Sequence, residues 1–249
     1  MCRHLAYLGP PRSPAGPLLE APHSLLRQSY APADMRGGGS VNADGFGLGW
    51  YAGGEPVRYR RPNPLWTDSA LPALAASLHS TAFLAAVRSA TVGMPVAESA
   101  CAPFEGGRWL FSHNGLVRGW PGSMAALAGR LPVTELLTLE ATTDSALLWA
   151  LLRARLDAGV PAVKAVAELV ADVEAAAPGS RLNLLLTDGE QLVATAWTHA
   201  LSVLTADGAV LIASEPFDDH PGWTPVPDRH LVHARGGDLT VAPIEVETP

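Results

Sequence analysis

The order of hydrophobic patterns along the chain limits its fold most strongly, because two helical segments separate two sets of strands. Residues 144–158 and 161–177 carry apolar side chains at helical spacing, and Pro178-Gly179 ends the second segment. Short apolar or alternating runs before them predict strands over 2–8, 45–52, 57–61, 83–87 and 108–112, with a short helix over 71–80. Further runs predict strands over 182–187, 192–197, 201–204, 210–213, 231–233 and 239–244. This order predicts an α+β fold in which two sheets are covered by helices.

Composition and charge exclude several classes of function. The chain has 249 residues, is 48% hydrophobic and shows neither repeat nor linker, so residues 1–249 are expected to form a single domain. A net charge of −7, with 17 Lys and Arg against 24 Asp and Glu, argues against a nucleic-acid partner. No apolar run approaches the roughly 18 residues of a membrane span, and no signal-peptide pattern follows Met1. We therefore expect no membrane partner and a cytoplasmic location.

The cysteine at position two offers a complete nucleophile if Met1 is removed. Cys2 would then carry a thiol, with a pKa of about 8.5, and a free α-amine, with a pKa of about 7.7–8.0, which can accept the thiol proton. N-terminal residues of this kind are known catalytic nucleophiles. Taken alone, a cysteine at this position is more often an accident of sequence. The other cysteine, Cys101, is interpreted as structural, and neither it nor the eight histidines show metal-ligand spacing.

Three further motifs suit the same chemistry, and each has an ordinary structural alternative. Asn114 and the backbone N–H of Gly115 can form an oxyanion hole, although Asn-Gly is also a common hairpin turn. Arg88 ends an apolar strand and can hold a carboxylate together with the Thr91 hydroxyl, or it can simply reach solvent. Asp144 can bind an ammonium group or cap the following helix. Together these groups match the requirements of hydrolysis of a γ-glutamyl amide.

The chain resembles the class-II glutamine amidotransferases of the N-terminal nucleophile hydrolase superfamily. The matching pieces occur in the family's order: Met1-Cys2-Arg3-His4, residues 42–50 (Asn-Ala-Asp-Gly-Phe-Gly-Leu-Gly-Trp), Arg88-Ser89-Ala90-Thr91, His113-Asn114-Gly115 and Thr143-Asp144-Ser145. The set is specific in combination, whereas no single piece is. The resemblance implies a four-layer αββα sandwich with Cys2 at the start of a strand, facing the cleft.

The resemblance also implies a role for each site residue, without a metal or organic cofactor. Cys2 would be the nucleophile with its own amine as base, and Asn114 with Gly115 would stabilise the oxyanion. The expected substrate-binding residues are Arg88 and Thr91 for the α-carboxylate, Asp144 for the α-ammonium, and His113 beside them. The expected partner is a small γ-glutamyl molecule.

A narrower resemblance concerns the substrate. Residues 28–32, 86–95, 213–219 and 226–232 resemble the branch of the family that removes glutamate from γ-glutamyl-hercynylcysteine S-oxide in ergothioneine biosynthesis. Ala146 stands where broader relatives often carry Glu, which argues against a generic glutaminase. The alternatives are a glutaminase subunit that passes ammonia to a separate synthase, and a catalytically silent binding protein. Tyr30, Trp66 and Phe104 are aromatic candidates for holding the substrate's trimethylammonium group.

Overall fold

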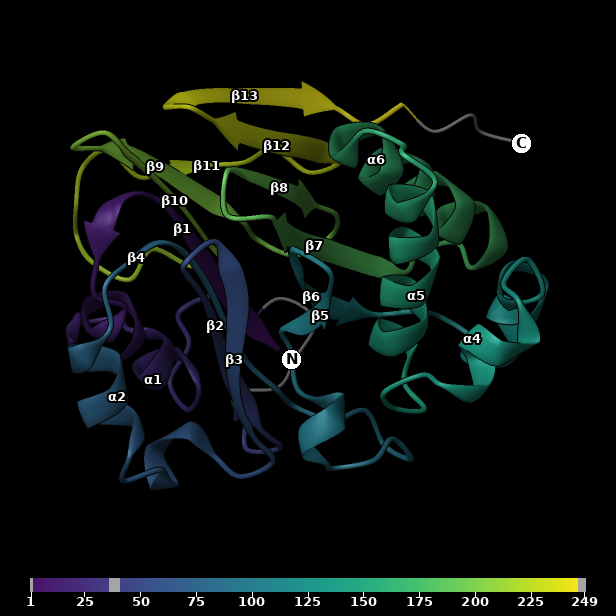
Figure 1. The fold of residues 1–249 in the computed structure, drawn as a ribbon, viewed down its shortest axis with the longest axis horizontal. Helices are drawn as coiled ribbons and strands as arrows, with labels where there is room; N and C mark the ends of the chain where they lie inside the picture. The colour runs from purple at the N-terminus through teal and green to yellow at the C-terminus, as the bar shows by residue number, and fades with distance from the viewer. Residues whose placement is uncertain (1, 36–40, 246–249) are drawn as a thin grey trace.

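Two antiparallel sheets lie face to face, and helices cover the outer face of each sheet (Figure 1). The structure, a computed structural model, describes residues 2–35 and 41–245. The α-helices are α1 (Leu25–Gln28), α2 (Leu71–Ser77), α3 (Ala125–Ala128), α4 (Val133–Leu137), α5 (Asp144–Asp157) and α6 (Ala162–Ala176). Single helical turns are η1 (Gly16–Glu20), η2 (Leu65–Thr67), η3 (Glu98–Ala100) and η4 (Gly122–Met124). The expected α+β class and the four-layer αββα arrangement are confirmed.

The first sheet carries the N-terminal strand at its centre. Within the described residues its seven strands follow the order β11 (Thr224–Pro225), β9 (Ser202–Ala206), β10 (Ala209–Ala213), β1 (Arg3–Arg12), β4 (Ser80–Val87), β2 (Phe46–Ala52) and β3 (Glu55–Arg61). Strand β1 pairs with β4 through Arg3 and Val87, and with β10 through Leu5 and Ala213. The start of β1 therefore lies between the end of β4 and the end of β10.

The second sheet carries the His-Asn-Gly motif. In the described part of the chain its six strands follow the order β13 (Asp238–Pro243), β12 (His230–Arg235), β8 (Gln191–Ala196), β7 (Arg181–Thr187), β6 (Trp109–Leu116) and β5 (Phe104–Gly106). Strand β6 pairs with β7, with Asn114 opposite Asn183. Asn114 and Gly115 therefore belong to a strand, and the alternative of an Asn-Gly hairpin turn is wrong.

Three apolar clusters hold the layers together. One packs α5 and α6 on the second sheet, another packs η1, α1 and α2 on the first sheet, and the third fills the space between the sheets. Glycines allow the sheets to approach closely at β2, because a Cβ at Gly49 would lie 2.8 Å from side-chain atoms of Leu110 and Pro103. The alternation of small and large residues over 45–52 therefore has a physical reason in this close contact.

The element boundaries differ from the sequence prediction in a few places. Strand β1 extends to Arg12, beyond its predicted end at residue 8, and helical turns occur within residues 16–28, for which no helix was predicted. Buried Leu18 and Leu25 anchor these turns under the first sheet, so tertiary packing outweighs the Pro- and Gly-rich composition. Asp188-Gly189 connects β7 to β8, and Asp207-Gly208 connects β9 to β10. No helix in the described ranges is long and apolar enough to cross a membrane.

Candidate active site

Cys2 lies at the edge of the first sheet where β1 begins. Arg3 pairs with Val87 of β4, which brings Cys2 next to Arg88 and Ser89, and the Cys2 Sγ is 3.8 Å from the carbonyl oxygen of Ser89. On the other side of β1, the backbone N–H of Ser214 donates to the carbonyl oxygen of His4 at 2.9 Å. The thiol is half-buried. Cys2 is thus held between the residues that follow β4 and those that follow β10.

A small cavity of about 30 Å³ joins Cys2 to residues of both sheets and of α5. Its lining includes three of the expected site residues, Cys2, Arg88 and His113, together with the neighbouring Ser112 and Ser145. A space of this size holds about two water molecules, whereas a glutamyl group is several times larger. This cavity alone is therefore too small to enclose a glutamyl group.

Arg88 and Thr91 differ in how the structure places them. The Arg88 guanidinium is half-buried and donates to the carbonyl oxygen of Pro95 at 2.9 Å and to that of Asp44 at 3.5 Å. It therefore turns inward at the strand end instead of extending freely into solvent. Thr91 is exposed in the following segment, beside the fully exposed Val92. The role of Thr91 in holding a carboxylate stays a prediction.

Asp144 is buried in the first turn of α5 and ties that helix to the end of β6. One carboxylate oxygen accepts from the backbone N–H of Val117 at 3.0 Å, and the other accepts from the backbone N–H of Ser145 at 2.7 Å. The cap of the helix is Thr143, whose hydroxyl accepts from the backbone N–H of Ala146 at 3.2 Å. Asp144 is therefore the first residue of the helix and not its N-cap. Its carboxylate lies near the small cavity, because it contacts Ser145, which lines that cavity.

His113 lies on the α5 side of β6, and both of its ring nitrogens have protein partners. Nδ1 is 3.0 Å from the Ser145 hydroxyl and Nε2 is 2.9 Å from the carbonyl oxygen of Arg181. Because a carbonyl oxygen only accepts, Nε2 carries the proton and Nδ1 accepts from Ser145. His113 lines the cavity, but its ring has no nitrogen left over for the substrate in this arrangement. Its role in substrate binding stays a prediction.

Asn114 points between the sheets toward the β10 side of Cys2. Its Nδ2 donates to the Ser214 hydroxyl at 3.2 Å, and the same hydroxyl accepts from the backbone N–H of His4 at 3.0 Å. An amide nitrogen carries two hydrogens, so one N–H remains for an oxyanion.

Gly115, the next residue of β6, packs tightly against β7, since a Cβ there would lie 1.8 Å from the carbonyl oxygen of Arg181. Only glycine allows β6 to run so close to β7 at this point.

Arg3, the residue after the nucleophile, makes a buried cluster that the sequence did not predict. Its Nε donates to the Glu215 carboxylate at 2.8 Å, Nη1 donates to the carbonyl oxygen of Cys2 at 3.1 Å, and Nη2 donates to the carbonyl oxygen of Asp34. The other Glu215 oxygen accepts from the backbone N–H of Ala33 at 2.7 Å. Breaking one partner of a buried pair typically costs about 3–5 kcal/mol. This cluster therefore fixes the backbone of Cys2.

Two buried histidines lie near this network, and burial is the main cause of their lowered pKa values. Burial and the nearby His113, His199 and Arg3 lower the pKa of His4 to about 3. Burial and the neighbouring Arg181 lower the pKa of His199 to about 4. Among the described residues, no hydrogen-bond partner contacts either ring nitrogen of His199 or Nε2 of His4. Both rings are therefore neutral in the folded protein near pH 7.

We expect these histidines to make the fold sensitive to mild acid. The unfolded chain binds protons at both rings below pH 6.5, whereas the folded chain does so only near the lowered pKa values of about 3 and about 4. The free energy of unfolding should fall with falling pH in this window, by at most about 1.4 kcal/mol per pH unit for each ring. Urea unfolding of wild type, His4→Gln and His199→Gln at pH 7, 6 and 5 measures the effect. Equal slopes in wild type and variants would refute it.

Cys101 is buried away from the small cavity, with a protonated thiol that contacts only protein groups, unlike the half-buried Cys2. It is fully buried, and its Sγ donates to the carbonyl oxygens of Arg61 at 3.3 Å and Ala97 at 3.4 Å. Burial raises the pKa of the Cys101 thiol to about 11. The thiol therefore stays protonated at neutral pH, and it packs against Gly45, where a Cβ would lie 2.3 Å from the sulfur. These contacts support a structural role.

Comparison with known proteins identifies the family. The model of the class-II glutamine amidotransferases matches residues 26–207, most of the chain. The chain belongs to this family. The matched range contains Arg88, Asn114 and Asp144 of the amidotransferase, while Cys2 and Ser214 lie outside it. The family predicted from the sequence is thus confirmed, and membership makes the chain an enzyme.

Two relatives extend the similarity over nearly the whole chain. A protein of Mycolicibacterium smegmatis, named gamma-glutamyl-hercynylcysteine sulfoxide hydrolase, is 46% identical over 98% of this chain and 100% of its own length. A protein of Mycobacterium tuberculosis with the same name is 41% identical over 98% of this chain and 97% of its own length. A solved class-II domain protein from Silicibacter pomeroyi is 23% identical, covers 98% of this chain and 99% of that chain, and superposes with a TM-score of 0.67. The similarity to the Silicibacter pomeroyi structure shows a shared fold and nothing more.

The sequence did not identify several residues of the amidotransferase site. Ser145, Ser112 and Ser214 contact or line the expected site, but isolated serines carry no distinctive spacing. Glu215 belongs to the stretch 213–219, which resembled known relatives, and its adjacency to the nucleophile becomes visible only when β10 pairs with β1. Within the described residues, no group of three or more His, Cys, Asp or Glu side chains is arranged to hold a metal ion.

Proposed function

We propose that this enzyme hydrolyses the γ-glutamyl amide of γ-glutamyl-hercynylcysteine S-oxide to glutamate and hercynylcysteine S-oxide, a step of ergothioneine biosynthesis. The observation that carries the proposal is the position of Cys2 between Arg88 on one side and the Ser214–Asn114 pair on the other. Two relatives named for this activity, aligned over 98% of the chain, support the choice of substrate. The proposal includes action in the cytoplasm on a free small molecule by residues 1–249 as one domain.

The nucleophile requires that Met1 be removed. Met1 lies outside the described residues, and its removal stays part of the proposal. The α-amine of Cys2 then accepts the thiol proton, and the thiolate attacks the γ-carbonyl carbon of the substrate. Arg3 donates a hydrogen bond of 3.1 Å to the carbonyl oxygen of Cys2. This bond fixes the backbone of Cys2, and with it the amine and the thiol, relative to β1.

Charge develops on the carbonyl oxygen as the tetrahedral intermediate forms. We assign its stabilisation to the remaining N–H of the Asn114 amide and to the backbone N–H of Gly115. The Ser214 hydroxyl, 3.2 Å from Asn114 Nδ2, orients that amide before substrate arrives. We assign the α-carboxylate of the glutamyl group to Arg88 and Thr91, and its α-ammonium to Asp144.

The reaction then proceeds through a glutamyl thioester. The C–N bond breaks as the Cys2 ammonium returns its proton to the departing amine nitrogen. A water molecule next attacks the thioester carbonyl while the Cys2 amine accepts the water proton. The C–S bond breaks, glutamate leaves with the new oxygen, and the proton returns to the cysteine, so the enzyme is regenerated without any other reactant.

A glutamate-release assay tests the proposed substrate. We expect kcat/KM for γ-glutamyl-hercynylcysteine S-oxide to exceed that for glutamine by at least about 100-fold, because only the larger substrate can use binding energy on its amine half. Both substrates present the same glutamyl group to Arg88 and Asp144. Equal kcat/KM values would favour the alternative of a glutaminase that supplies ammonia to a separate synthase. Absence of turnover with both would favour a silent binding protein.

A further inference from the structure

A buried cluster of polar side chains lies between the two sheets, in a layer that is otherwise apolar. Ser112 and Asn114 share the face of β6 that points away from α5, because His113 between them contacts Ser145 of that helix. Opposite them on β1, the Nδ1 of His4 is 3.2 Å from the Ser112 hydroxyl. We call the whole group the inter-sheet polar cluster; its members are each at most 4% exposed and comprise His4, Ser112, Asn114, Asn183, His199 and Ser214.

Four side-chain atoms of the cluster have no hydrogen-bond partner among the described residues. They are Nε2 of His4, Oδ1 of Asn114 and both ring nitrogens of His199. The two rings lie near each other, since His199 is one of the groups that lower the pKa of His4. Buried polar atoms are nearly always paired with protein or with an internal water, and such a water typically makes two to four hydrogen bonds. The cluster therefore offers the partners of an internal water site.

The chain holds His199 in the cluster with a strained turn. The Asn183 amide accepts from the backbone N–H of His199 at 3.2 Å and donates to the carbonyl oxygens of His199 and Ala200, each at 3.2 Å. Just before it, Thr198 has a φ of +80°, which β-branched residues rarely adopt, and its N–H donates to the Asp228 carboxylate at 2.7 Å. Strain that is held by surrounding contacts points to a functional constraint on the side chain that it places.

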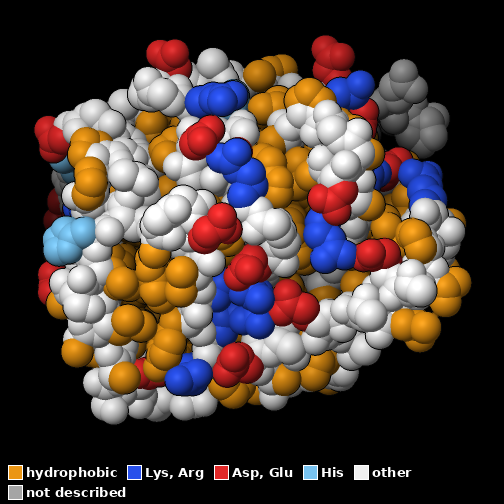
Figure 2. Space-filling view, viewed as in Figure 1, with side chains coloured by type: hydrophobic (Ala, Val, Ile, Leu, Met, Phe, Trp, Pro, Cys, Tyr) orange, Lys and Arg blue, Asp and Glu red, His pale blue; other side chains and the backbone are white. Residues whose placement is uncertain are grey.

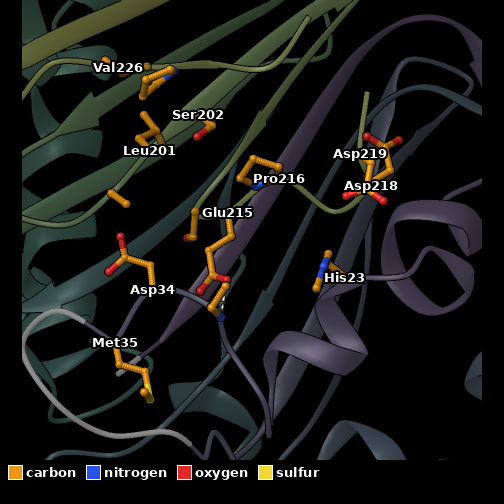
Figure 3. A pocket seen from close by; sticks show the side chains of 14 residues that line it. His23, Asp34, Met35, Leu201, Ser202, Glu215, Pro216, Asp218, Asp219 and Val226 are labelled. Atoms are coloured by element: carbon orange, nitrogen blue, oxygen red, sulfur yellow. Dashed lines mark hydrogen bonds between the residues drawn. The ribbon is translucent and has the colours of Figure 1, made fainter. Parts of the chain in front are cut away.

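The cluster borders a second cavity, of about 580 Å³ (Figure 3). Ser214 lines this cavity, as do Ala200 and Leu201, the two residues that follow His199. Behind Ser214, its hydroxyl accepts from the backbone N–H of His4 and from the side chain of Asn114. Water in the cavity is therefore separated from the cluster by a single layer of residues.

The orientation of the Asn114 amide decides whether it can stabilise an oxyanion. Nδ2 donates to the Ser214 hydroxyl at 3.2 Å, but a hydroxyl can donate as well as accept. The same contact would therefore form if the amide turned by 180° and presented Oδ1 to Ser214. A turned amide would place an acceptor where negative charge develops. A second contact, to Oδ1, is needed to hold the amide in the productive orientation.

We infer that a water molecule enclosed by Asn114, His4 and His199 donates to Oδ1 of Asn114 and fixes the orientation of its amide. This inference rests on the proposed function, because it concerns the same oxyanion site. His4 and His199 are positioning residues, which act through the water and Asn114 without touching the substrate. Neutral imidazoles suit this role, since each has one donor and one acceptor nitrogen for water.

The first test compares two substitutions of His4 by steady-state kinetics. In His4→Leu the water loses a partner, and the amide oxygen gains one by turning toward the Ser214 hydroxyl. We expect kcat to fall by about tenfold or more with KM nearly unchanged. His4→Gln keeps a polar group for the water and should stay within about twofold of wild type. The matched control is His233→Leu, a half-buried ring that contacts Gln191 and is expected to leave kcat unchanged.

The Asn114→Ala background separates this role from a purely structural one. If His4 acts through the Asn114 amide, His4→Leu should change kcat of Asn114→Ala by less than about twofold, because no amide remains to be oriented. An equal loss in both backgrounds would show that His4 acts on Cys2 or on the fold as a whole, and would overturn the inference. A His4→Leu protein with the kcat of wild type would overturn it as well. Thermal unfolding shows that each variant is folded at the assay temperature.

A crystal structure of wild type gives a measurement that does not depend on activity. It should show a water molecule within hydrogen-bonding distance of Asn114 Oδ1 and of His4 Nε2. Direct packing of Asn114 Oδ1 against protein atoms, with no water between the rings, would overturn the inference and leave the proposed function intact. The kinetic comparison uses whichever γ-glutamyl substrate wild type hydrolyses. If wild type hydrolyses none, the proposed function has failed, and the crystal structure alone decides whether the water is bound.

Discussion

Cys2→Ala is expected to abolish glutamate release from every γ-glutamyl substrate. The substitution removes the only half-buried thiol at the small cavity among the described residues, while the neighbouring contacts of Arg3 and Ser89 are largely made by backbone and guanidinium groups. The loss of kcat should reach the background of the assay, because no other described group at this edge is a nucleophile of comparable strength. Glutamate release measured under saturating substrate, with intact mass of the same sample to establish whether Met1 is absent, checks this expectation.

Cys101→Ala is the matched control for the nucleophile. This thiol is buried and its pKa is raised to about 11, so its removal should leave kcat near wild type and lower stability only modestly. If Cys101→Ala loses turnover and Cys2→Ala keeps it, the nucleophile is wrongly assigned. Active wild-type protein whose mass retains Met1 throughout would contradict the proposed use of the Cys2 α-amine as base.

Asn114→Ala is expected to lower kcat by about 10²–10³ with a much smaller change in KM, as is typical when one oxyanion donor is lost. Its amide lies between the sheets, 1% exposed, with one N–H on the Ser214 hydroxyl and one left for the substrate. The interaction forms only as charge develops on the substrate oxygen, so it acts on the transition state more than on binding. Steady-state kinetics with the hercynyl substrate separate kcat from KM.

Asn114→Asp separates the donor role from the shape of the side chain. Aspartate has almost the same volume but offers no N–H when ionised, so this variant should lose kcat as severely as Asn114→Ala. Thermal unfolding of both variants shows whether the fold survives the change at a buried position. A folded Asn114→Asp protein with near-normal kcat would exclude Asn114 from the oxyanion hole.

Periodic patterns predicted most of the architecture, because burial of one face imposes a period on the sequence. The apolar spacing over residues 144–158 predicted α5 with an error of one residue at its end. The short apolar runs after residue 181 predicted β7 to β10, β12 and β13. The end of β6 was missed since Asn-Gly is typical of turns. In the protein the strand continues through Gly115, where the contact with the carbonyl oxygen of Arg181 leaves no room for a side chain. That contact belongs to β7, 66 residues further along the chain, and no local pattern records it.

The site was predictable where chemistry alone identifies a residue. Cys2, Arg88 and His113 do line one cavity, while Asp144 is one residue from its lining at Ser145 and Asn114 reaches the site through Ser214. The supporting contacts were not predictable, because Arg3 and Glu215 are 212 residues apart in sequence. The ion pairs of Arg58 and Arg60 in β3 with Glu105 in β5 and Glu140 before α5 likewise join distant segments. Figure 2 shows basic and acidic side chains side by side near the middle of this face.

The pairing of β1 with β10 determines when the site can assemble during synthesis of the chain. Cys2 is synthesised about 200 residues before the strand beside it, the serine that contacts Asn114 and the carboxylate that holds Arg3. A chain still in synthesis therefore lacks the groups that fix the backbone of Cys2 and orient Asn114. Under the proposed mechanism, it can turn over substrate only after β10 has been made and has paired with β1.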